Sequence, residues 1–218
     1  MRTLTICLLV FAGIAHAESG TVEGKVTLMS QGVFGKSTKG DASSVAIVLE
    51  GGKLAAGKKP QANKAMRQHE RAFVPGMIVI EKGGTIDFPN DDKVDHNVFS
   101  PSETARFDLE LYRSGTSKAW TFNRVGAVNV FCNIHEEMAA RIVVVDTPWY
   151  TTTDKDGRFA IRDIAPGSYN VVAWPKFGDP YRATITVKAG KNDLDLTVVE
   201  GKRPDHQRKD GTPYGRYQ

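Results

Sequence analysis

Three side chains that bind soft metal ions follow one another at three-residue steps in one short segment. In FCNIHEEM, residues 131–138, these are Cys132, His135 and Met138, and His96 lies upstream in the segment DHNVF. A thiolate, two imidazoles and a weak thioether form the donor set of a trigonal copper site with a distant axial sulfur. One loop can present three of these donors to a point, and His96 must then arrive from the end of another strand. The sequence therefore predicts one copper ion, alternating between Cu(I) and Cu(II), bound by these four residues.

The cysteine content agrees with an exported metal protein. Residues 1–17 have the pattern of a secretory signal peptide: Arg2, an apolar run over residues 4–14 and an Ala-His-Ala end. The apolar run is too short to span a bilayer, and no later transmembrane segment is expected. Once this leader, which contains Cys7, is removed, Cys132 is the remaining cysteine. An unpaired thiol in an oxidising compartment is exposed to disulfide exchange unless a metal or an intermolecular disulfide occupies it. We therefore expect a periplasmic or secreted protein.

Composition limits the fold and the partners. The chain has 218 residues and a formal net charge of +4, without a basic stripe interleaved with aromatic residues. Binding to nucleic acid is therefore not expected. Runs of Val, Ile and Thr separated by Gly, Asp and Asn predict an all-β protein, and the length suffices for two small domains.

The segments around the four donors alternate like strands. They include GMIVIE at residues 76–81, TIDF at 85–88, AVNVF at 127–131 and AARIVVVD at 139–146. Together with the C-x-x-H-x-x-M spacing, this run resembles the cupredoxins, the blue-copper electron carriers of the plastocyanin and amicyanin type, including those of methylamine utilisation. The resemblance covers roughly residues 60–146 and implies a Greek-key β-sandwich whose first strand spans residues 65–73.

The same resemblance implies roles for the residues around the metal. His96, Cys132 and His135 would form the trigonal plane, with Met138 as the axial donor. Asn97 would tie the two ligand-bearing loops together, Phe131 would give the site an apolar wall, and Asn133 would lie beside them as a further neighbour of the metal ligands.

A second resemblance lies towards the C-terminus. The sequence TDKDGRFAI … IAPGSYNVVAW after residue 147 resembles the carboxypeptidase regulatory-like, transthyretin-like β-sandwich. The opening strands of such a sandwich are absent from residues 147–200, but residues 21–28 and 45–49 supply two suitable strands. We therefore predict a discontinuous domain of residues 20–50 and 147–200 with the cupredoxin inserted at a surface loop. Residues 201–218 lack periodicity and are expected to form a flexible basic tail.

The favoured function is a periplasmic mononuclear type 1 copper protein that carries electrons and is not an enzyme. The expected partner is a redox protein such as a c-type cytochrome, attracted by an acidic pole around the metal. That pole comprises Asp91, Asp92, Asp95, Glu136 and Glu137. Two alternatives remain: a protein that delivers or sequesters copper, and an exported structural or adhesive module with a vestigial site.

Overall fold

The structure is a computed structural model that describes residues 18–32, 35–51 and 63–214. The predicted signal peptide, residues 1–17, lies outside the described residues. The described residues form strands and turns without a helix, so the predicted all-β class is confirmed. None of these residues builds a helix of the length and hydropathy that a membrane span requires.

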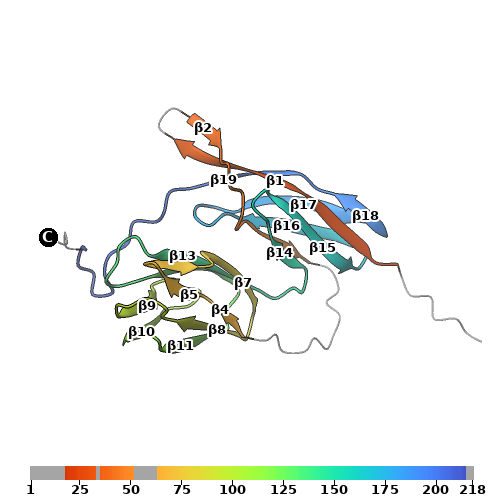
Figure 1. The fold of residues 1–218 in the computed structure, drawn as a ribbon. Helices are drawn as coiled ribbons and strands as arrows, with labels where there is room; N and C mark the ends of the chain where they lie inside the picture. Colours follow the sequence, from red (N-terminus) through yellow and green to blue (C-terminus); the bar gives the residue numbers. More distant parts are fainter. Residues whose placement is uncertain (1–17, 33–34, 52–62, 215–218) are drawn as a thin grey trace, which may run out of the picture.

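Residues from both ends of the chain form one pair of sheets (Figure 1). The long strand β1 (Gly20–Gly32) pairs in parallel with two late strands and in an antiparallel manner with two others. These four are β18 (Gly190–Asp193), β19 (Leu196–Glu200), β2 (Gly35–Thr38) and β15 (Arg158–Ile164). The facing sheet has the order β14 (Tyr150–Thr152), β3 (Ala46–Glu50), β16 (Gly167–Trp174) and β17 (Tyr181–Val187). Residues 20–50 and 150–200 thus share one core.

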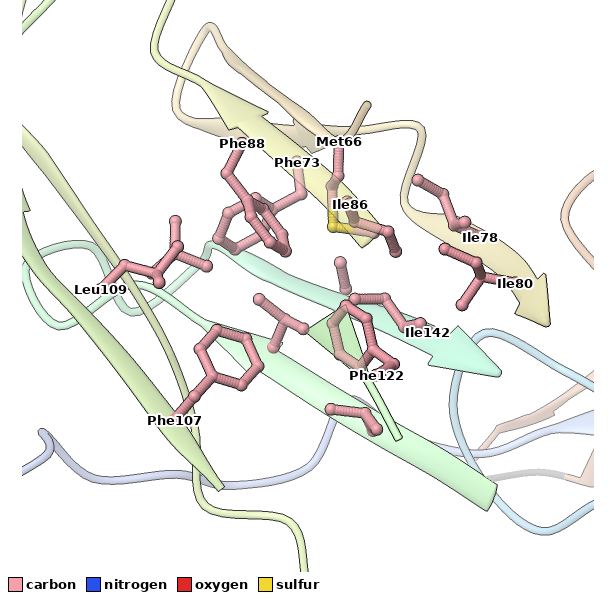
Figure 2. Close-up of a cluster of buried hydrophobic side chains, with 14 of the residues drawn as sticks. Met66, Phe73, Ile78, Ile80, Ile86, Phe88, Phe107, Leu109, Phe122 and Ile142 are labelled. Carbon is pink, nitrogen blue, oxygen red and sulfur yellow. The ribbon is translucent and has the colours of Figure 1, made fainter. Parts of the chain in front are cut away.

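The middle of the chain forms a second pair of sheets. The larger sheet has the order β10 (Phe107–Tyr112), β9 (His96–Ser100), β12 (Gly126–Phe131), β13 (Ala139–Val145) and β7 (Met77–Glu81). The smaller sheet has the order β11 (Ser117–Phe122), β8 (Gly84–Pro89) and β4 (Lys64–Ala65). Large apolar side chains from both sheets meet between them, with Phe122 and Ile142 among those in Figure 2.

The two sandwiches stack into four β layers with three apolar interiors. Strand β13 shows why: Ile142 enters the core of the second sandwich, and the adjacent Val143 packs against the first sandwich. Strand β3 behaves in the same way, with Ile47 on one face and Val48 on the other. Successive side chains on a strand point to opposite faces, so both strands carry apolar side chains on both faces. The layer between the sandwiches fixes one against the other.

A buried arginine adds polar contacts to this layer. Arg141 on β13 is 5% exposed, and its Nη1 donates to the carbonyl oxygens of Pro175 at 3.1 Å and Gly178 at 2.8 Å. Its guanidinium also lies over the Trp174 ring, 5.7 Å from the centroid. These hydrogen bonds join the second sandwich to the loop after β16. This second sandwich, here called the ligand-bearing sandwich, carries the four predicted ligands His96, Cys132, His135 and Met138.

Two expectations for local structure are wrong. Residues 65–73 do not form one strand, because Glu70 and Arg71 have φ values of 51° and 54° and turn the chain into a hairpin. The hairpin joins β5 (Arg67–His69) to β6 (Ala72–Val74). Residues 201–214 are not a free tail either, since they pass beside this second sandwich, at the left of Figure 1, and are held there by ring stacking and ion pairs.

Candidate metal centre

Strand pairing brings the distant His96 to the loop that carries Cys132 and His135. Strands β9 and β12 are antiparallel, and Phe99 is paired with Phe131. Continued along the strands, this register sets the first residue of β9, His96, beside the loop that follows β12. The loop itself is closed by two main-chain hydrogen bonds of 3.2 Å, Cys132 N–H to Met138 O and Met138 N–H to His135 O.

Three donor atoms converge at this end of the sheet. The Sγ atom of Cys132 lies 3.8 Å from Nδ1 of His96 and 3.8 Å from Nδ1 of His135. The two Nδ1 atoms are 3.2 Å apart. His96 and Cys132 are fully buried, and His135 is partly exposed.

These separations fit a metal ion. Bonds of about 2.0–2.1 Å to nitrogen and about 2.3 Å to sulfur, as in zinc sites, separate donors in a trigonal plane by about 3.5–3.8 Å. Without a cation or shared protons, three lone-pair donors at such distances would repel one another. The donor set of two imidazoles and one thiolate in a trigonal arrangement is that of copper electron-transfer sites.

The predicted axial residue, Met138, is fully buried in the apolar cluster that contains Cys132. Ile134 packs against the same cluster and shields the loop. The structure thus brings three predicted ligands to donor distance and places the fourth in the cluster beside them.

The surroundings of Cys132 favour its thiolate. Burial alone would raise the pKa of the thiol, but the hydrogen bond with His96 and main-chain N–H groups outweigh it, so the pKa lies below its ordinary value. One of these groups is the N–H of Ile134, which points at Sγ over 3.5 Å. Because the thiolate is the form that binds metal, the site is prepared for a cation.

Asp92 has a role that the sequence did not reveal. Its Oδ2 lies 2.8 Å from Nε2 of His96, and its carboxylate also accepts the N–H groups of Glu70 at 2.6 Å and Arg71 at 2.9 Å. Burial acts to raise the pKa of Asp92, but these hydrogen bonds outweigh it and the net pKa is lowered. An ionised carboxylate can only accept, so Nε2 of His96 carries a proton, and Nδ1 is the ring nitrogen that a metal would bind. Residues 91–95 form a loop, in which no side-chain spacing is regular, so the sequence carried no local signal for this contact.

Asp92→Asn is expected to weaken copper binding by about 10- to 100-fold. The amide can donate towards Nε2 of His96 and no longer fixes the metal-binding tautomer. Competition with a chromogenic Cu(I) chelator measures the change. Asp95→Asn, at an exposed acid of the same loop, is the matched control and should leave the affinity unaltered. Equal affinities of the two variants would show that Asp92 does not orient His96.

The predicted neighbours of the ligands are present, but Asn97 acts differently from the prediction. Its main-chain N–H is directed at the sulfur of Cys132, whereas its side chain donates to Oδ1 of Asp108 on β10 at 2.6 Å. The side chain therefore does not tie the two ligand loops directly. Phe131 points away from Cys132 into a separate apolar cluster with Phe99, because neighbouring residues on a strand face opposite sides.

The acidic pole is smaller than the sequence suggested. Asp91 is paired with the guanidinium of Arg67, and the Asp92 side chain is only 12% exposed. Four of the five acids are exposed, but Arg67 neutralises Asp91, which leaves the negative charges of Asp95, Glu136 and Glu137. Local pairing, which the sequence pattern does not show, removes the other two from the surface charge.

Comparison with known proteins finds both resemblances again. Residues 138–199 match the family model of the carboxypeptidase regulatory-like domain. The match begins at Met138 and so includes β13, although this strand pairs with β12 and β7 of the larger sheet of the second sandwich. No curated protein sequence matches significantly.

Solved structures that resemble the fold include copper proteins. The Cu(I) form of one amicyanin mutant is 16% identical, with a TM-score of 0.36, over 38% of this chain and 82% of that chain. The reduced form of a second amicyanin mutant is also 16% identical, with a TM-score of 0.37, over 45% of this chain and 98% of that chain. A copper-containing nitrite reductase from Thermus scotoductus SA-01 is 20% identical, with a TM-score of 0.38, over 44% of this chain and 25% of that chain. Likenesses this distant carry no weight for function, which must come from this chain's own side chains.

Proposed function

We propose that this protein is an exported type 1 copper protein that carries single electrons. The observation that carries the proposal is the convergence of His96 Nδ1, Cys132 Sγ and His135 Nδ1 within 3.2 to 3.8 Å. A bound copper ion would supply the one-electron change between Cu(II) and Cu(I). No catalytic step is proposed for the chain.

The protein would hold the donor atoms in fixed positions and exclude water from them. Cys132 and Met138 are fully buried at the two ends of a loop mounted between β12 and β13. His96 is fixed by Asp92 on one side and by its place at the start of β9 on the other. Donors that barely move between the two oxidation states lower the reorganisation that electron transfer requires.

The exit for the electron is His135, because it is the partly exposed member of the donor set. The exposed carboxylates of Glu136 and Glu137 follow it directly, and Asp95 precedes His96. Complementary charge raises the rate of encounter more than the affinity. We therefore propose a redox partner with a positively charged docking face, such as a c-type cytochrome.

Stoichiometric addition of Cu(II) to the mature protein tests the proposal. We expect an intense thiolate-to-copper band in the visible range, bleached by reduction and restored by oxidation over many cycles. A copper-delivery protein would instead retain Cu(I) without reversible colour, and a structural module would take up no copper. Either result would refute the proposed role as an electron carrier.

The same preparation tests the docking face. Reduction by a cationic reagent should slow as salt is added, and reduction by an anionic reagent should accelerate, because salt screens exposed charges. The same salt dependence for both reagents would contradict the acidic face.

A further inference from the structure

The C-terminal segment of residues 204–214, here called the strap, touches the neighbours of both candidate ligand segments. At its middle, the main-chain N–H of Lys209 donates to Oδ1 of Asn133 at 2.7 Å. At its end, the hydroxyl of Tyr214 donates to the carbonyl oxygen of Cys132 at 2.5 Å. The strap therefore contacts two consecutive residues of the loop that carries the sulfur donor.

The strap also reaches β10, the strand that pairs with β9, on which His96 lies. The Nζ atom of Lys209 lies 2.6 Å from Oδ2 of Asp108 and 2.5 Å from Oε2 of Glu110. The other oxygen of Asp108 accepts from Nδ2 of Asn97 at 2.6 Å, and Asn97 directly follows His96. A bulge in β10 between Asp108 and Leu111 interrupts the pairing with β9 beside this contact.

These contacts form one continuous hydrogen-bonded connection across the site. It runs from Asn97 through Asp108 and Lys209 to Asn133, and so from the residue after His96 to the residue after Cys132. The resemblance to cupredoxins assigned the joining of the two ligand loops to Asn97 alone. In this chain the side chain of Asn97 reaches only as far as Asp108, and Lys209 of the strap completes the connection.

Local hydrogen bonds define the shape of the strap. A turn between Arg208 and Gly211, with Gly211 at φ 83°, positions Lys209. Oδ1 of Asp210 accepts from both N and Oγ1 of Thr212, at 2.9 and 2.7 Å, and stiffens this turn. The imidazole of His206 stacks on Phe131 with 4.0 Å between ring centroids. Between the strap and the sheet lies a cleft of about 840 Å³, so discrete contacts rather than continuous packing hold the strap.

We infer that the strap is a positioning element of the candidate copper site, which clamps the segment of His96 to the loop of Cys132 through Lys209. The part of this inference that concerns copper release rests on the proposed function. The clamp itself is a property of the chain without metal. Loss of the Lys209 ammonium should loosen the ligand loop and speed the release of copper.

The test compares Lys209→Met with Lys202→Met in the full chain. Both variants remove one ammonium from the chain after β19, but Lys202 is exposed and precedes the strap. In the metal-free protein, amide exchange of residues 132–138 should accelerate about tenfold in the Lys209 variant, an amount typical of a charge-assisted hydrogen bond. In the copper-loaded protein, extraction by a chelator should accelerate about tenfold and the visible band should shift. Lys202→Met should change none of these quantities.

The outcomes separate the clamp from the proposed function. Unaltered amide exchange in Lys209→Met overturns the inference, and so does accelerated exchange with unaltered copper extraction. If the unmodified protein takes up no copper, the proposed function fails, and accelerated amide exchange still establishes the clamp. Tyr214→Phe, which removes only the hydroxyl that donates to Cys132, is a second variant and should accelerate exchange in the same loop.

Discussion

Cys132→Ser is expected to abolish the visible absorption of the copper-loaded protein. A serine hydroxyl is neither soft nor ionised at neutral pH, so it cannot form the thiolate bond that gives the colour. The loss of Cu(I) affinity should exceed the roughly 100-fold effect of removing a hydrogen-bond partner of a ligand. Titration with Cu(II) under visible spectroscopy, and with Cu(I) in the presence of a competing chelator, measures both effects.

The control for Cys132→Ser replaces a histidine that lies outside the candidate site. His69 on β5 is exposed and does not belong to the group of converging donors in the described residues. His69→Gln should therefore keep the band and the affinity. A Cys132→Ser variant that keeps the intense band, or a His69→Gln variant that loses it, would contradict the assignment of the ligands.

Ile142→Ala is expected to lower the free energy of unfolding of the metal-free protein by about 2–5 kcal/mol. Ile142 is fully buried in the core of the ligand-bearing sandwich (Figure 2). It lies on β13 between Val128 of β12 and Ile78 of β7. Truncation leaves a cavity among side chains that are fixed from two sheets. Unfolding in denaturant, followed by tryptophan fluorescence, measures the change.

A surface substitution provides the comparison for Ile142→Ala. Thr186 on β17 is exposed, so Thr186→Ala should change the free energy of unfolding by less than about 0.5 kcal/mol. If Ile142→Ala costs no more than this control, β13 does not have the packing described for it.

The features that could be predicted from the sequence are those with a local pattern. The uninterrupted apolar run at residues 45–49 indicates a strand buried on both faces, because alternation normally leaves one face polar, and β3 is buried in this way. The three-residue steps from Cys132 to Met138 indicated the loop, and the structure brings Cys132 and His135 of this loop together with His96. The segment after residue 147 likewise resembles a carboxypeptidase regulatory-like sandwich, and the family model of that domain matches residues 138–199.

The features that escaped prediction depend on partners far away in the sequence. Asp92 resembles any acid of a polar loop until the hairpin at Glu70 donates two N–H groups to it. Lys209 resembles a solvated tail residue until it meets Asp108, about a hundred residues earlier, as the sequence separation of 101 shows. Pairings of this kind are set by tertiary folding, and no periodicity in the sequence around Asp92 or Lys209 predicts them.

X-ray absorption at the copper edge of the loaded protein tests the central claim most directly. Three donors that converge on one ion should give a single copper with one short bond to sulfur and two bonds to imidazole nitrogen. A coordination shell of nitrogen and oxygen alone, without sulfur, would contradict the site formed by His96, Cys132 and His135.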